Sequence, residues 1–227
     1  MEGLKAWLNQ LDFSFVYNIL LTALACLTCI TLHELAHGLI ALAMGDKTAK
    51  EMGRLDLNPL KHMDLVGLAM LALVGFGWAK PVPVNPRRFK SPKWGMALCA
   101  LAGPFCNILI CFLGFVLLFA LTLAGFTSQT GGLGGFVSNY LVLTVSLSAG
   151  MAAFNLLPVP PLDGSKVLFS VLPAKAYQFV LRYERYGMVL LLLLVVFGVL
   201  DGFLLSARVF LLESVQNLVF RIYLLFV

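Results

Sequence analysis

Long apolar runs constrain the fold of this chain more than any other feature, because about 20 apolar residues suffice to cross the hydrocarbon core of a bilayer as a helix. Hydrophobic residues make up 60% of the 227 positions and charged residues only 12%, about half the charged share of a typical soluble domain. We therefore predict an all-α polytopic membrane protein. The expected apolar segments are 12–44, 94–126, 136–157, 186–200 and a C-terminal stretch at 203–227, which either crosses the membrane or lies along its surface.

The length suits one compact domain, so residues 1–227 are expected to form a single integral membrane unit. We predict a three-helix core within residues 12–173 and additional C-terminal membrane helices within 186–227. The five cysteines all lie in apolar segments, and their odd number argues against a disulfide framework. They are interpreted as packing residues.

The stretch 65–90 does not fit a spanning helix. Its first part, LVGLAMLALVGF at 65–76, is too short to cross the membrane, which favours a re-entrant or interfacial element. The part that follows, GWAKPVPVNPRRFK at 77–90, contains three prolines and cannot be the interior of a helix. Its alternation around Val82 and Val84 fits an extended edge strand, where proline is tolerated.

Basic residues gather in the three stretches 45–62, 77–93 and 158–185, which together hold 13 of the 16 Lys and Arg residues. If 65–76 is re-entrant and the next two apolar segments cross out and back, all three stretches lie on one side of the membrane. The positive-inside rule assigns that side to the cytoplasm. We therefore predict a multi-pass protein of the cell membrane. Because this topology accounts for the net charge of +5, the charge does not indicate a nucleic-acid partner, and we predict none.

The motif TLHELAHG at 31–38 places two of the three histidines of the chain inside the first apolar segment. Ionisable groups are costly in hydrocarbon and mark functional sites by default. On a helix, His33 and His37 share one face and can both reach one Zn²⁺ at about 2.0–2.1 Å, while Glu34 can act as general base toward a water molecule. The alternative is a pair of satisfied histidines in the bundle interior with a glutamate facing a cavity. His37 precedes Gly45 by eight residues, so it is expected about 12 Å below the cytoplasmic end of the helix.

A catalytic zinc needs a third protein ligand and an open position for water. Asp163 follows the proline-rich break in FNLLPVPPLDGSK at 154–166, and broken backbone at membrane depth lines a cavity or is buried in protein. We favour Asp163 over His62, which lies in a charged loop. Asp163 could instead form a turn with Gly164 or cap the next helix. The full set of candidates is His62, Asp64, Asp163 and Asp201.

Together, TLHELAHG and FNLLPVPPLDG resemble the site-2 protease family of intramembrane zinc metalloproteases. Three further motifs, GRLDLNPLKHMD, GWAKPVPVNPRRF and LAGPFCN, match in family order over roughly 30–170, and the chain is similar to the short branch that has no peptide-binding domain. The resemblance implies that His33, His37 and Asp163 hold one zinc ion and that Glu34 is the base. It also makes Asn107 and Asn155 candidates for supporting the active site or the scissile carbonyl. For Asn107 the alternative is a hydrogen bond between helices.

We therefore predict a zinc endopeptidase that cuts membrane-anchored proteins within or near their transmembrane segments, as in regulated intramembrane proteolysis. A helical substrate must unwind before it is cut, and the stretch 77–86 is predicted to bind the unwound chain by β-augmentation. The substrate-binding residues would be Pro81, Val82, Pro83, Val84 and Asn85, although these prolines could instead shape an interfacial loop.

Two rival functions stay open from the sequence. The first is a metal-binding membrane scaffold or a metal transporter, although no repeated halves suggest alternating access. The second is a proteolytically inactive relative that binds membrane proteins. The sequence specifies neither the substrate nor the oligomeric state.

Overall fold

The computed structural model describes residues 14–64, 66–67, 79–126, 132–173 and 186–225. Four helices are long and apolar enough to cross a membrane, which confirms the prediction of an all-α polytopic membrane protein; no strand occurs in these ranges. The long helices are α2 (Ser14–Ala43), α5 (Pro92–Leu123), α6 (Gly132–Asn155) and α9 (Asp201–Tyr223). The shorter ones are α3 (Thr48–Glu51), η1 (Pro59–His62), η2 (Pro86–Arg88), α7 (Asp163–Val171) and a helix at Tyr186–Val196.

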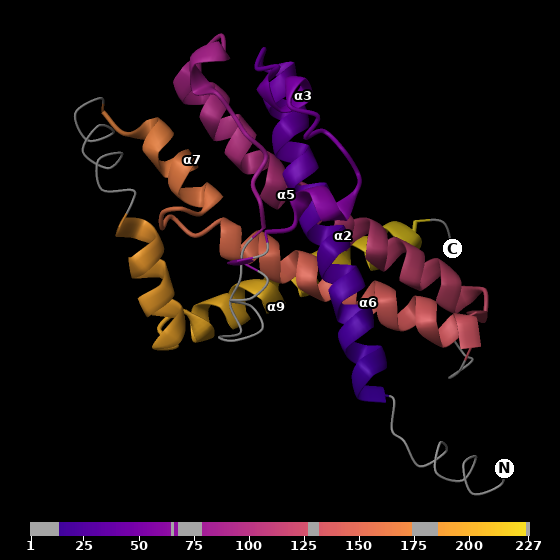
Figure 1. The fold of residues 1–227 in the computed structure, drawn as a ribbon. Coiled ribbons are helices and arrows are strands. Elements are labelled where there is room, and N and C mark those ends of the chain that lie inside the picture. The colour runs from indigo at the N-terminus through magenta and orange to yellow at the C-terminus, as the bar shows by residue number, and fades with distance from the viewer. Residues whose placement is uncertain (1–13, 65, 68–78, 127–131, 174–185, 226–227) are drawn as a thin grey trace, which may run out of the picture.

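Helix α5 is central, since it packs against α2, α6, α7 and α9. In Figure 1, α5 starts beside the upper part of α2 and crosses behind it, α6 also crosses behind α2, and α9 lies behind α6. Small side chains permit these close approaches, because apolar helices in a membrane gain from tight packing rather than from leaving water. At Gly114 of α5, an added Cβ would lie 2.4 Å from Cγ2 of Val145 on α6.

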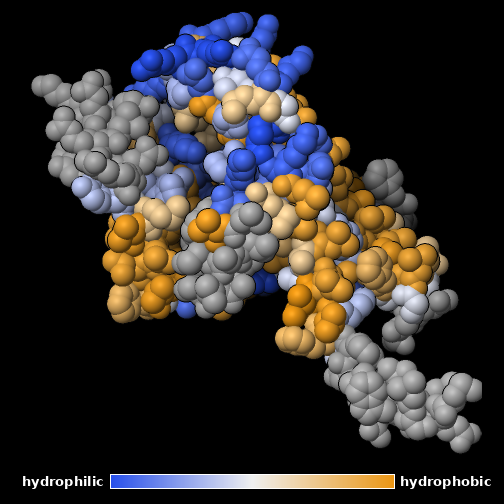
Figure 2. All heavy atoms as spheres, in the orientation of Figure 1, coloured by the Kyte–Doolittle hydropathy of each residue, from blue (hydrophilic) through white to orange (hydrophobic). Residues whose placement is uncertain are grey.

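Hydrophilic residues gather at one end of the molecule, around α3 and the neighbouring loops, and hydrophobic residues cover the long helices (Figure 2). This end holds the basic stretches that follow α2 and precede α5. Two of the three predicted basic stretches therefore lie at one end, as far as they are described; Lys175, Arg182 and Arg185 of the third stretch lie outside the described residues.

The first three apolar segments coincide with α2, α5 and α6 to within four residues at each end. The segment predicted at 186–200 is shorter in the structure, because its helix ends at Val196 and Gly198, with φ +66°, turns the chain before α9. The C-terminal stretch forms α9, whose packing against α5 and α6 favours a crossing helix over a surface helix.

Most of the run 65–76 lies outside the described residues. The stretch that follows it can be followed from Ala79, which forms an isolated antiparallel bridge with Met63. Beyond Ala79 the chain is irregular up to Asn85, whose backbone is extended, and η2 begins at Pro86. In the described part, the predicted edge strand is therefore a segment outside any sheet, with a single bridge at its start.

Gly114→Ala should destabilise the bundle by about 1–3 kcal/mol, because the new methyl group must push α5 away from Val145. Thermal unfolding in detergent measures the loss. Gly202→Ala on α9 is the matched control, since a Cβ there meets nothing within 4 Å. Equal melting temperatures for the two variants would contradict the inferred close approach of α5 and α6.

Candidate metal centre

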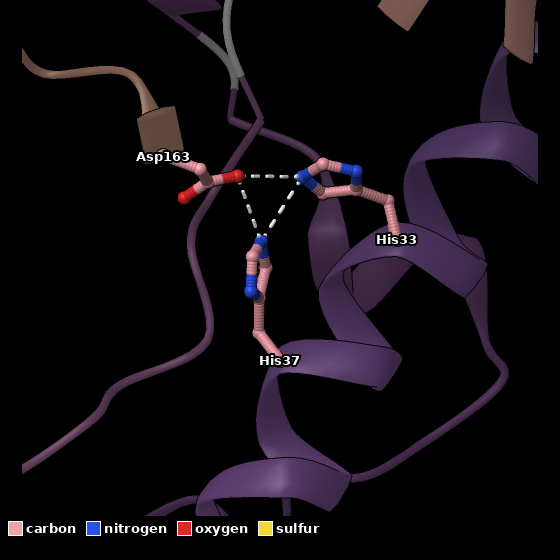
Figure 3. Close-up of side chains that lie close together, drawn as sticks. All are labelled: His33, His37 and Asp163. Atoms are coloured by element: carbon pink, nitrogen blue, oxygen red, sulfur yellow. Dashed lines mark hydrogen bonds and ion pairs between the residues drawn. The ribbon is translucent and has the colours of Figure 1, made fainter. Parts of the chain in front are cut away.

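Three buried side chains, two from α2 and one from α7, converge on one another (Figure 3). His33 and His37 extend from adjacent turns of α2, and Asp163 is the first residue of α7. The two Nε2 atoms are 3.0 Å apart, and Oδ2 of Asp163 lies 3.2 Å from Nε2 of His33 and 3.1 Å from Nε2 of His37. The structure thus brings together the three residues that the sequence predicts as ligands.

This triangle has the size that one zinc ion requires. At metal–ligand distances of about 2.0–2.1 Å, two ligand atoms of a tetrahedral site lie about 3.3 Å apart. Two imidazoles and one carboxylate are also an established donor set for a catalytic zinc. Among the described residues, this is the single group of three or more His, Cys, Asp or Glu side chains with such geometry.

The outer nitrogen of His37 fixes its tautomer. Nδ1 lies 2.6 Å from the carbonyl oxygen of Cys99 on α5. Because a carbonyl only accepts, Nδ1 must carry the proton, and Nε2 then keeps its lone pair for a metal. The backbone of α5 thereby prepares His37 as a ligand.

Asn107 plays the corresponding part for His33. Its amide Nδ2 lies 3.2 Å from Nδ1 of His33, while its Oδ1 is buried and has no partner in the described structure. If Nε2 of His33 binds a metal, Nδ1 carries a proton and needs an acceptor. Turning the amide over places Oδ1 against Nδ1–H and satisfies both groups, and the two orientations are nearly isosteric.

Gly103 allows the histidines to rest directly on α5. A Cβ at this position would lie 2.4 Å from Nε2 of His37 and 2.6 Å from Nε2 of His33. Asn107 lies one turn further along the same face. The motif Gly-Pro-x-x-Asn therefore supplies a gap for both imidazoles and a partner for one of them.

Asp163 reaches the histidines because the chain breaks after α6. Helix α7 begins at Asp163 itself, and Gly164 packs so closely that a Cβ would lie 2.2 Å from the carbonyl oxygen of Leu156. Nζ of Lys166 lies 3.5 Å from Oδ1 of Asp163, on the carboxylate oxygen that does not face the imidazoles. Asp163 thus offers one oxygen to the site.

The rival ligands are used elsewhere. His62 is buried on η1, with Nε2 2.8 Å from the carbonyl oxygen of Asp56. Asp64 accepts a hydrogen bond from the backbone N–H of Gly67. Neither of them belongs to the triangle, nor does Asp201 at the start of α9.

Glu34, the predicted base, contacts the irregular segment that begins at Ala79. Its Oε2 accepts a hydrogen bond of 2.8 Å from the backbone N–H of Val82, and its Oε1 accepts none from the described residues. One oxygen is therefore held while the other stays available to a water molecule.

Asn155 differs from the other predicted residues. It is the last residue of α6, and its Nδ2 donates to the carbonyl oxygen of Met151 within the same helix. No hydrogen bond between Asn155 and the triangle occurs in the described structure, so its role stays a prediction.

The predicted substrate-binding residues form a segment that is anchored along its length. The backbone N–H of Lys80 donates to the carbonyl oxygen of His62, and the Arg54 guanidinium donates to the carbonyl oxygens of Lys80 and Pro81. Further along, the N–H of Asn85 donates to Oδ2 of Asp46 at 2.6 Å. Val84 lies between these anchors, and its N–H and C=O make no hydrogen bond to any described residue.

Gly103, Asp46 and Lys166 contribute to the site but are absent from the predicted set. Gly103 carried a signal, because a glycine beside a proline in an apolar helix implies a close contact. Lys166 follows Asp163 at the i,i+3 spacing of a helical ion pair, whereas the contact between Asp46 and Asn85 follows from no local pattern.

A family comparison decides the class of this centre. The model of peptidase family M50 matches residues 21–199, which include every member of the triangle. The chain belongs to peptidase family M50. It is a membrane metalloprotease of the site-2 protease type, as its motifs suggested, and the family implies zinc as its metal.

Two relatives extend this result. YwhC of Bacillus subtilis (strain 168), named as a zinc metalloprotease, is 39% identical over 166 residues, which cover 73% of this chain and 75% of the relative. Rip2 of Mycolicibacterium smegmatis (strain ATCC 700084 / mc(2)155), also named as a zinc metalloprotease, is 28% identical over 209 residues, covering 86% of this chain and 74% of the relative. No solved structure matches the chain.

Asn107→Leu should weaken zinc binding by about 10- to 100-fold, because Nδ1–H of His33 loses its acceptor in a buried site. Asn107→Asp should keep the affinity within a few-fold, since a carboxylate also accepts from Nδ1–H. Competition with a chromophoric chelator measures both. Full affinity in Asn107→Leu would show that Asn107 does not orient His33.

Proposed function

We propose that this M50 protease is an intramembrane zinc endopeptidase that cuts membrane-anchored proteins within or near their transmembrane segments. The observation that carries the proposal is the buried triangle of His33, His37 and Asp163 inside a bundle of apolar helices, with Glu34 on the same helix. One triangle holds one ion, so each chain would bind a single zinc.

The side chains around the triangle suit peptide hydrolysis. Bound zinc would polarise the scissile carbonyl and lower the pKa of a water molecule toward 7. Oε1 of Glu34 would take the proton as the water oxygen bonds to the carbonyl carbon. Glu34 would then deliver that proton to the leaving amine as the C–N bond breaks. The hydrogen bond from Val82 would hold the other carboxylate oxygen still meanwhile.

The orientation in the membrane is part of the proposal. Hydrophilic residues gather at the end of the molecule that holds α3 and the segment before α5 (Figure 2), and the sequence there includes nine of the 16 Lys and Arg residues, in 45–62 and 77–93. By the positive-inside rule this end faces the cytoplasm, and His37 lies about two turns of α2 from it. We expect a protein of the cell membrane whose active site is nearer the cytoplasmic side.

The substrate would bind by adding a strand at Val84. A residue whose N–H and C=O are both free can exchange two hydrogen bonds with one residue of an antiparallel partner. Val84 meets this condition among the described residues, whereas the N–H groups of Val82 and Asn85 are already bonded and Pro81 and Pro83 have none. An unwound substrate paired at Val84 would lie two residues from the N–H that holds Glu34.

The proposed reaction is tested by zinc content and cleavage of a membrane-anchored reporter in detergent. Glu34→Gln should lose at least about 1,000-fold in activity while retaining zinc, because an amide cannot accept the proton. Asp163→Ala should lose both activity and zinc, because one ligand of the triangle is gone. Treatment with a chelator should stop cleavage by the wild type, and added zinc should restore it.

Two results would overturn the proposed function. If Glu34→Gln cleaves the reporter at the wild-type rate, Glu34 is not the base. If the wild type binds zinc but never cleaves, a metal-binding scaffold or a transporter replaces the protease.

Strand addition is tested separately by Val84→Pro, which removes the free N–H. We expect KM to rise about 10-fold, the effect of losing one well-formed hydrogen bond to substrate. Zinc content should not change. Val84→Leu, which keeps the N–H, should behave like the wild type. An unchanged KM in Val84→Pro would exclude pairing at this residue.

A further inference from the structure

We propose that Asp46 is a positioning residue for the base. It holds residues 80–85, here called the anchored segment, in the register that places the N–H of Val82 on Glu34. This inference rests on the proposed role of Glu34. Asp46 touches neither the triangle nor the substrate, and it would act only through the backbone of the anchored segment.

The Asp46 carboxylate is fully buried at the end of α2. Its Oδ1 accepts from the backbone N–H of Thr48 at 2.9 Å and from the Thr48 hydroxyl, and its Oδ2 accepts from the N–H of Asn85. Burial opposes ionisation, but the hydrogen bonds from Asn85 and Thr48 outweigh it and hold the pKa of Asp46 below its usual range. The group is therefore a buried anion whose two oxygens both accept.

Accepting the local hydrogen bond from the N–H of Thr48 does not require a carboxylate at position 46. Serine or asparagine could also accept from an N–H two residues ahead. Only a carboxylate, however, can accept at both ends, since an amide presents one acceptor and one donor end. The second oxygen of Asp46 serves Asn85, which is 39 residues further along the chain.

Asp46 is well placed to set the register because it is fixed to the helix that carries Glu34. Helix α2 ends at Ala43, and Gly45, with φ +104°, turns the chain so that the N–H of Asp46 donates to the carbonyl oxygen of Ala41. Two carboxylates fixed to one rigid helix thus bind two N–H groups of the anchored segment.

Within residues 81–83, no backbone N–H other than that of Val82 can donate to Glu34. Pro81 and Pro83 flank it, so Val82 carries the one N–H in that stretch. The Val82 side chain is buried against Gly38, one turn beyond Glu34, where an added Cβ would lie 3.1 Å from Cγ1 of Val82. The segment is fixed upstream by the bond from Lys80 to His62 and downstream by Asp46. Removing the hydrogen bond between Asp46 and Asn85 would let the segment shift, so that the N–H of Val82 no longer reaches Glu34.

The test compares Asp46→Asn with Asp56→Asn in the zinc-loaded, full-length protein. Asp56 is a matched control, because its Oδ1 also accepts from an N–H two residues ahead, at 2.9 Å, but its carboxylate is exposed and bonds to Lys61 rather than to the anchored segment. Hydrogen exchange would be followed at the amides of Val82 and Asn85, alongside zinc content, kcat and KM.

In Asp46→Asn we expect both amides to exchange at least about 10-fold faster and kcat to fall by about 10- to 100-fold, as when a partner that orients a catalytic group is lost. Zinc content should be unchanged, and because Val84 lies in the released segment, KM should rise as well, by less than kcat falls. Asp56→Asn should match the wild type in every measurement. Val82→Pro should lower kcat similarly, and combining it with Asp46→Asn should add little, because both act on one hydrogen bond.

The inference is overturned if Asp46→Asn speeds exchange at Asn85 alone, or if it loses zinc, which would indicate a general structural role. Should Asp46→Asn fail to fold, Asp46→Ser serves instead, since its hydroxyl can accept from Thr48 but cannot reach Asn85. If the wild type proves inactive, the proposed function fails, while exchange at Val82 still decides whether Asp46 holds the segment.

Discussion

The contact between α2 and α5 at Gly103 is the constraint on which the site depends. Two imidazoles can be buried in an apolar bundle only if each ring nitrogen has a partner, and both partners of the outer nitrogens come from α5. The carbonyl of Cys99 serves His37 and the amide of Asn107 serves His33. Neither would reach its histidine if a side chain at position 103 separated the helices.

A second set of contacts supports Glu34, the proposed base. The irregular chain around Val82 lies against α2 and contributes a backbone donor to Glu34, while Arg54 and Asp46 fix the backbone on either side. The triangle is therefore held by a neighbouring helix, whereas Glu34 is held by a segment that lies outside the helices of the described residues. Such an arrangement can keep the metal ligands rigid and still leave a backbone edge open to another chain.

The sequence predicted most where the type of residue and its spacing along a helix point to the same structure. The four-residue spacing of His33 and His37 predicts a shared helix face, and in the structure both imidazoles lie beside Asp163. The apolar runs likewise predict α2, α5 and α6. The contact between Asp46 and Asn85 could not be predicted. It joins a side chain to a backbone group 39 residues away, and the periodicity of a helix or strand relates only residues that are close in the chain.

The order of the ligands along the chain has a consequence for biosynthesis. His33 and His37 enter the membrane with the first helix, but Asp163 follows only after α5 and α6 have been made and inserted. Until then the two imidazoles lack the Asp163 carboxylate, so a half-made chain lacks one member of the proposed metal centre. If the triangle is the metal centre, the nascent chain cannot complete it until α7 has been made and Asp163 has reached the two imidazoles of α2.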